Sequence, residues 1–92
     1  MTTEALEKLR EYAAALLPPG EIAILMGIPP DERKEFTLRC RSREGDPVYE
    51  AFHHGRLTTK LELRTNIIKL AKAGSPAAEP LAEKFLREQN LD

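Results

Sequence analysis

Apolar residues recur at helical spacing near the start of the chain. They are separated by intervals of three, four, three and one residues, which places them on one stripe of a helix: Leu6, Leu9, Ala13, Leu16 and Leu17. Thr3 is a suitable N-cap for this helix. The run Pro18-Pro19-Gly20 ends it, because a proline disfavours helical dihedrals at the residue before it. The pattern therefore predicts a helix over residues 4–17.

Two shorter helices are predicted after this break. Residues 20–27 are nearly all apolar after Glu21, so we expect this helix to be the most buried one. Gly27 can adopt the left-handed conformation that ends it. The third helix covers residues 31–42, which are highly charged, and its candidates for contact with the core are Phe36 and Cys40, together with Leu38 or Thr37.

A capping residue followed by proline occurs twice in the second half of the chain. Asp46-Pro47 predicts the start of a long helix over residues 47–73, and Ser75-Pro76 predicts a last helix over residues 75–89. Pro80 lies inside the last range, so that helix either kinks there or becomes regular only near Pro80.

The helices account for nearly the whole sequence. No stretch alternates between apolar and polar residues as a half-buried strand does. Gly55 leaves open whether the segment 47–73 is one helix or two. The length of 92 residues is sufficient for one hydrophobic core. The sequence therefore predicts an all-α fold of five helices in a single domain, 1–92.

The apolar residues of the segment 47–73 cover a wider arc of the helix than a single buried face would. Placed on a continuous helix, the apolar residues form two stripes with a basic row between them: Leu57, Leu61 and Ile68; Leu63, Ile67 and Leu70; and Arg56, Lys60 and Arg64. One interpretation is a subunit interface at Leu57, Leu61 and Ile68, which predicts a homo-oligomer. The other is a central helix that its own neighbours cover completely.

Charge is distributed unevenly along the chain. The net charge is −1, yet residues 33–72 hold ten basic side chains against five acidic ones, while both ends of the chain are acidic. A basic centre of this kind is typical of a nucleic-acid-binding face, and it also occurs on solvated surfaces that bind nothing.

The spacing of Ala23, Gly27 and Ile28 is that of a helix-turn-helix. A small residue allows close helix crossing, a glycine four positions later permits the turn, and Ile28 would fill the core beneath it. Arg33 stands where this motif usually buries an aliphatic residue, whereas Phe36 fits the pattern. The motif would span residues 18–43. Its second helix, with the row on the long helix, would supply the candidate DNA contacts: Arg33, Lys34, Arg39, Arg41, Arg43, Arg56, Lys60 and Arg64.

Three segments resemble the small helix-turn-helix proteins of phage and prophage, particularly the small-terminase-like group. They are Glu21-Ile22-Ala23-Ile24-Leu25-Met26-Gly27, Tyr49-Glu50-Ala51-Phe52-His53-His54-Gly55-Arg56 and Leu70-Ala71-Lys72-Ala73-Gly74-Ser75-Pro76-Ala77-Ala78. This resemblance covers about residues 17–87. It implies binding of double-stranded DNA, a cytoplasmic location, self-association, no catalysis and a large packaging subunit as a candidate partner.

Other chemistry has little support in the sequence. His53 and His54 are adjacent and would point about 100° apart on a helix, so a metal site is not expected. Cys40 lacks the Gly-rich turn of a nucleophile site and is expected to be a small core residue.

Phosphate-binding loops and paired carboxylates are absent from the sequence, so we expect no enzyme and no cofactor. The longest apolar run is too short to cross a membrane, and the N-terminal residues do not have the layout of a secretory signal. The main hypothesis is a small DNA-binding protein of phage type, with the role of a packaging adaptor as its candidate function. The alternative is a helical protein–protein interaction module that does not bind nucleic acid.

Overall fold

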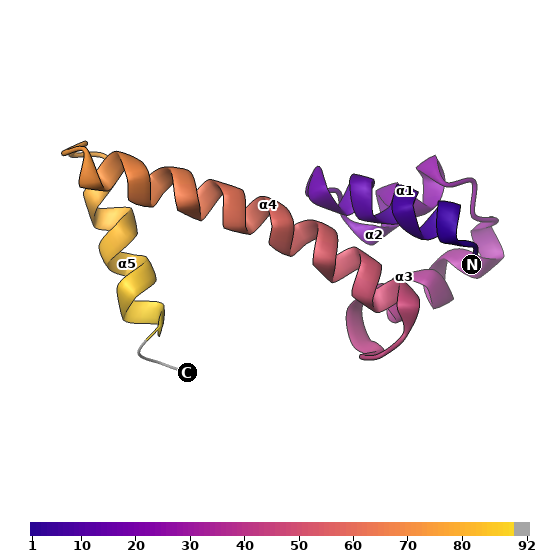
Figure 1. Cartoon of the computed structure of the whole chain (residues 1–92). Coiled ribbons are helices and arrows are strands. Elements are labelled where there is room, and N and C mark those ends of the chain that lie inside the picture. The colour runs from indigo at the N-terminus through magenta and orange to yellow at the C-terminus, as the bar shows by residue number, and fades with distance from the viewer. Residues whose placement is uncertain (90–92) are drawn as a thin grey trace. The chain divides into compact units, whose positions relative to one another are not determined.

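The structure is a computed structural model that describes residues 1–89 (Figure 1). Every regular element in this range is helical, which confirms the predicted all-α fold with five α-helices. The elements are α1 (Thr3–Ala14), α2 (Pro19–Leu25), the short 3-10 helix η1 (Pro30–Glu32), α3 (Arg33–Ser42), α4 (Pro47–Lys72) and α5 (Glu79–Gln89).

The chain divides into two compact units, one at residues 1–59 and one from residue 60 onward. The boundary lies within α4, which therefore contributes to both units. Whether the two units fold together as the predicted single domain stays a prediction.

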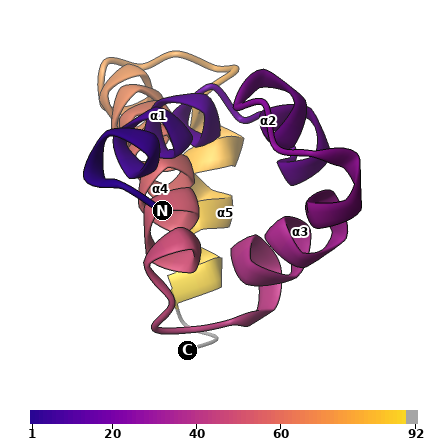
Figure 2. The same cartoon turned by 90° about the vertical axis from the view of Figure 1, so that its right-hand side faces the viewer.

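The first unit has a continuous hydrophobic core. Figure 2 shows α1, α2 and α3 gathered around the first turns of α4. Nine residues from these four helices are buried together: Leu9, Ala13, Ile22, Ala23, Phe36, Cys40, Val48, Ala51 and Phe52. Each of these nine residues is at most 4% exposed. The first unit therefore has the close-packed interior of a small globular domain.

Gly55 does not interrupt α4, because the helix is continuous from Pro47 to Lys72. Its role is a close helix crossing. A Cβ atom at this position would collide with the carbonyl oxygen of Arg10 and would lie 2.9 Å from Cβ of Ala13. Only glycine lets α4 approach the backbone of α1 this closely.

The ends of α1 differ from the prediction by a few residues. The N-cap is Thr2 instead of Thr3, and its Oγ1 accepts a hydrogen bond of 3.1 Å from the amide of Ala5. The helix ends at Ala14 instead of residue 17, because Leu16 adopts a left-handed conformation with φ of 65°. The amide of Leu17 then donates to the carbonyl of Tyr12, which completes a Schellman-type end.

The same type of end follows α2, this time with glycine. Gly27 has φ of 71°, and the amide of Ile28 donates to the carbonyl of Ala23. The prediction that this helix is the most buried is wrong for two of its apolar side chains. Ile22 and Ala23 are fully buried, whereas Ile24 and Leu25 are more than half exposed. A helix of two turns presents only one face to the core.

The third helix begins at Arg33 instead of residue 31. The preceding residues form the 3-10 turn η1, in which the amide of Glu32 donates to the carbonyl of Pro29. A tight turn of this kind is common ahead of an α-helix. Phe36 and Cys40 are both buried, as predicted, whereas Leu38 is 43% exposed and so does not belong to the core.

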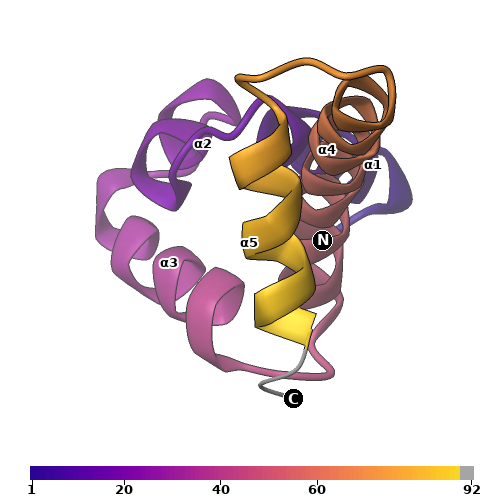
Figure 3. The ribbon, with the colours of Figure 1, turned by 90° about the vertical axis from the view of Figure 1, so that its left-hand side faces the viewer.

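The second unit contains the end of α4 and the whole of α5, joined by a turn at Gly74 (Figure 3). The predicted helix 75–89 begins only at Glu79, so its regular part starts near Pro80, one of the two arrangements that the sequence left open. Proline is tolerated there because the first-turn amides of a helix have no partner within it. Within residues 60–89, only Ala78 is buried.

Candidate interaction surfaces

Arg39, one of the predicted DNA contacts, is bound to a carboxylate in its own unit. Its Nε and Nη2 each donate a hydrogen bond of 3.0 Å to Asp46, a bidentate pair. Asp46 also accepts a 2.8 Å hydrogen bond from the amide of Val48 and so caps α4. The hydrogen bond from Arg39 is the main cause that lowers the pKa of Asp46, and the same bond raises the pKa of Arg39. This arginine therefore holds the turn between α3 and α4.

Two further cations of this segment also have partners. The guanidinium of Arg43 lies 2.6 Å from the carboxylate of Glu35, and both side chains are about half exposed. Such an exposed pair contributes little to stability. Nε of Arg33 donates to the carbonyl of Ile28 at 2.9 Å, so it supports the turn after α2.

Lys34 and Arg41 remain on the exposed face of α3. They are seven residues apart, which places them on one side of the helix, with the half-exposed Leu38 between them. Within residues 1–89 neither side chain forms an ion pair. The exposed face of α3 therefore carries two unpaired cations instead of the predicted five.

Arg56 is a structural residue of the first unit. Its Nη2 donates to the carbonyl of Leu17 at 3.2 Å, and its guanidinium carbon lies 4.8 Å from the ring centroid of Phe52. Its Nε is buried without a hydrogen-bond partner. Thr59, one turn later, donates from Oγ1 to the carbonyl of Ala14. Both side chains thus satisfy carbonyl groups at the end of α1.

Arg64 has an equivalent place in the second unit. It lies 2.7 Å from the carboxylate of Glu88, and its guanidinium carbon is 4.2 Å from the ring centroid of Phe85. The hydrogen bond from Arg64 is the main cause that lowers the pKa of Glu88. Lys60, one turn earlier, is exposed and forms no ion pair within the described residues.

The predicted DNA contacts are thus of two kinds. Arg33, Arg39, Arg43, Arg56 and Arg64 are bound to acceptors within their own units, and Lys34, Arg41 and Lys60 are not. The sequence could not separate the two groups, because the carboxylate partners are seven, eight and twenty-four residues away. Whether the cations of both units face one ligand stays a prediction.

The large apolar side chains of the second unit are mostly exposed to solvent. The predicted interface residues are exposed: Leu61 by 67% and Ile68 by 38%, with Leu57 of the first unit at 57%. Four further leucines that the interface prediction did not include are exposed by 44 to 64%: Leu63, Leu70, Leu81 and Leu86. Leu63 and Leu70 belong to the second apolar stripe that the sequence contains.

The residues considered for other chemistry serve the fold. Cys40 is fully buried, which confirms the expected core role, and burial raises the pKa of its thiol to about 11. Nε2 of His53 lies 3.0 Å from the carbonyl oxygen of Cys40, which ties α4 to the end of α3. Nowhere in residues 1–89 do three or more His, Cys, Asp or Glu side chains gather in a group that could hold a metal ion.

No helix between residues 1 and 89 combines the length and the apolar character needed to cross a membrane. Comparisons with protein-family models, curated proteins and solved structures found no match to this chain. The likeness to small-terminase-like proteins therefore stays a prediction from the sequence.

Proposed function

We propose that the protein is a non-catalytic helical protein–protein interaction module that self-associates through the exposed leucines of residues 60–89. The observation that carries this proposal is the imbalance within these residues. One small side chain is buried, while six large apolar side chains are exposed: Leu61, Leu63, Ile68, Leu70, Leu81 and Leu86.

Two helices without a core are marginal in water. Most of the stability of a helix in a protein comes from packing an apolar face against a neighbour. Full burial of one leucine side chain contributes about 1.5–3 kcal/mol. A partner that covers several of these leucines would therefore stabilise residues 60–89 as well as bind them.

The spacing along α4 supports a helical partner surface. Leu63 and Leu70 are seven residues apart, and so are Leu61 and Ile68, which gives two stripes that each persist over two helical turns. Apolar residues at this spacing are what helices use to pack against one another.

Duplex-DNA binding through α3 is a second candidate. It is favoured by Lys34 and Arg41 on the exposed face of the helix that follows the left-handed turn at Gly27. With two phosphate contacts, the logarithm of the affinity should fall with the logarithm of salt concentration at a slope of about −2. The variant Lys34→Glu/Arg41→Glu should abolish this binding, and affinity that does not change with salt would contradict it.

Sedimentation equilibrium of the full chain tests self-association. The wild-type protein should increase in mean mass between micromolar and millimolar concentration. The variant Leu63→Glu/Leu70→Glu should weaken association at least about 100-fold, because two leucines lose their burial and two charges enter the interface. Thr65→Glu/Asn66→Glu is the matched control, since it adds the same charge to exposed polar positions of the same helix.

A wild-type protein that stays monomeric throughout this range would contradict the proposal. Equal loss of association in both variants would also contradict it, because charge instead of apolar contact would then be the cause.

A further inference from the structure

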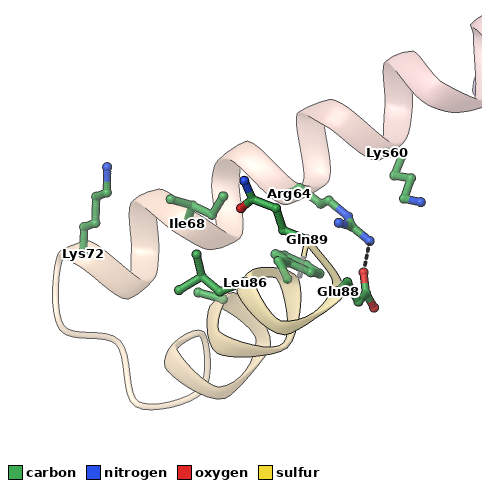
Figure 4. Close-up of a pocket in the computed structure, with 9 residues that line it drawn as sticks. Lys60, Arg64, Ile68, Lys72, Leu86, Glu88 and Gln89 are labelled. Atoms are coloured by element: carbon green, nitrogen blue, oxygen red, sulfur yellow. Dashed lines mark hydrogen bonds and ion pairs between the residues drawn. The ribbon is translucent and has the colours of Figure 1, made fainter. Parts of the chain in front are cut away.

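The second unit contains a groove of about 720 Å³ between α4 and α5 (Figure 4). Apolar side chains from both helices line its centre: Ile68, Ala82, Phe85 and Leu86. Leu86 is 64% exposed and Ile68 is 38% exposed, so this lining faces solvent. An exposed apolar groove bounded by polar groups is a common form of binding site for another chain.

The ends of the groove are basic. Lys60 and Lys72 stand at opposite ends of the α4 wall, as Figure 4 shows, and neither forms an ion pair within the described part of the chain. Arg64 and Glu88 also line the groove, but they neutralise each other at 2.7 Å. The two lysines therefore give the groove a net positive charge at the two places where a ligand would leave the apolar centre.

The dimensions of the groove suit a helix. Lys60 and Lys72 are twelve residues apart on α4, which corresponds to about 18 Å along the helix axis. A ligand helix of about three turns would span this length. Its apolar residues would follow the i, i+3, i+4, i+7 spacing used in groove recognition, and two acidic residues about eleven positions apart would reach the lysines.

The helix α1 of a second copy fits this description poorly. Its exposed side chains include Glu4, Glu7 and Glu11, whose negative charge is complementary to the two lysines. Its apolar residues Leu9 and Ala13 are fully buried in the first unit, so they cannot also fill a groove. A nucleic-acid backbone would match the lysines but would leave the apolar lining uncovered.

We propose that the groove between α4 and α5 binds an acidic amphipathic helix of a partner protein, with its apolar face on Ile68, Phe85 and Leu86 and its carboxylates at Lys60 and Lys72. This site overlaps the self-association surface proposed above at Ile68 and Leu86, whereas Leu63 and Leu70 do not line it. Substitutions at Leu63 and Leu70 therefore test self-association without changing the lining of the groove.

Fluorescence anisotropy of a labelled peptide added to the full chain tests the proposal. The probe is an end-capped alanine-based helix of about 16 residues, with leucines at i, i+3, i+4 and i+7 and two glutamates about eleven positions apart. The wild-type chain should bind it, and Lys60→Glu/Lys72→Glu should weaken binding at least about tenfold. A peptide with lysine in place of both glutamates should show the reverse preference, which excludes misfolding of the variant.

The matched control is Lys69→Glu/Lys84→Glu. It makes the same change in charge at exposed lysines of the same unit that do not line the groove, so it should bind the original peptide as the wild type does. Absence of peptide binding to the wild-type chain, or equal weakening by the two lysine pairs, would overturn the proposal. It would also be overturned if Lys60→Glu/Lys72→Glu abolished self-association instead, because a second copy would then occupy the groove. Peptide binding by a chain that stays monomeric would refute self-association alone.

Discussion

The two units of this chain bury their apolar residues to very different extents. Residues 1–59 enclose a core in which Leu9, Ile22 and Val48 are fully inaccessible to solvent. Residues 60–89 hold five leucines, all of them exposed, and bury only Ala78. The difference shows that apolar content does not by itself make a core, since several elements must converge on it. The first unit has this convergence within one chain, and the second is proposed to obtain it from partners.

The largest expected effect breaks the core of the first unit. In Gly55→Ala, the added methyl group collides with backbone of α1, so we expect a loss of about 3 kcal/mol in the free energy of unfolding. Chemical denaturation followed by circular dichroism measures it. Gly20→Ala is the control, because nothing lies within 4 Å of its added Cβ, and it should change stability by less than about 1 kcal/mol.

A smaller effect of opposite sign is expected at the end of α1. Leu16 adopts the left-handed conformation with φ of 65° and is 48% exposed. Leu16→Gly removes the steric strain and loses little burial, so it should stabilise the first unit by about 0.5–1 kcal/mol. Thermal unfolding should show a rise of a few degrees. Gly27→Ala should have the opposite effect, because φ of 71° strains any side chain, and a fall in stability for Leu16→Gly would contradict this account.

The smallest effect concerns pH. The pKa of Asp46 is lowered in the folded protein, chiefly by its hydrogen bond from Arg39. As the pH falls, the Asp46 carboxylate of the unfolded chain binds a proton before that of the folded chain does. The contribution of the Asp46 carboxylate to stability is therefore complete above about pH 4 and is lost as the pH falls further. Denaturation midpoints between neutral and acidic pH measure this loss. Asp46→Asn keeps a capping group for α4 and should show a smaller dependence on pH.

The sequence predicted the elements well and their surroundings less well. The caps, prolines and glycines that set helix boundaries act within a few residues, so the start of α4 at Pro47 and the end of α3 at Ser42 were correct, and several other boundaries were off by one to four residues. Phe36 and Cys40 were correctly assigned to the core from their spacing of four.

The candidate site residues were less predictable, because the residues that contact them are distant in sequence. Arg39 and Arg64 were expected to face DNA, but each is bound to a carboxylate that only the fold brings near. Leu61 and Ile68 were expected at an interface and are exposed, which is the condition such a role requires. The groove with Lys60 and Lys72 at its ends could not be inferred from one helix alone, because α5 supplies half of its lining.

Hydrogen exchange of the full chain at several protein concentrations tests most directly the claim that residues 60–89 depend on a partner. Amides of residues 1–59 should show protection that does not change with concentration, because their core is complete within one chain. Amides of residues 60–89 should exchange rapidly at low concentration and gain protection as association proceeds. Strong protection of residues 60–89 in a dilute monomer would contradict the account.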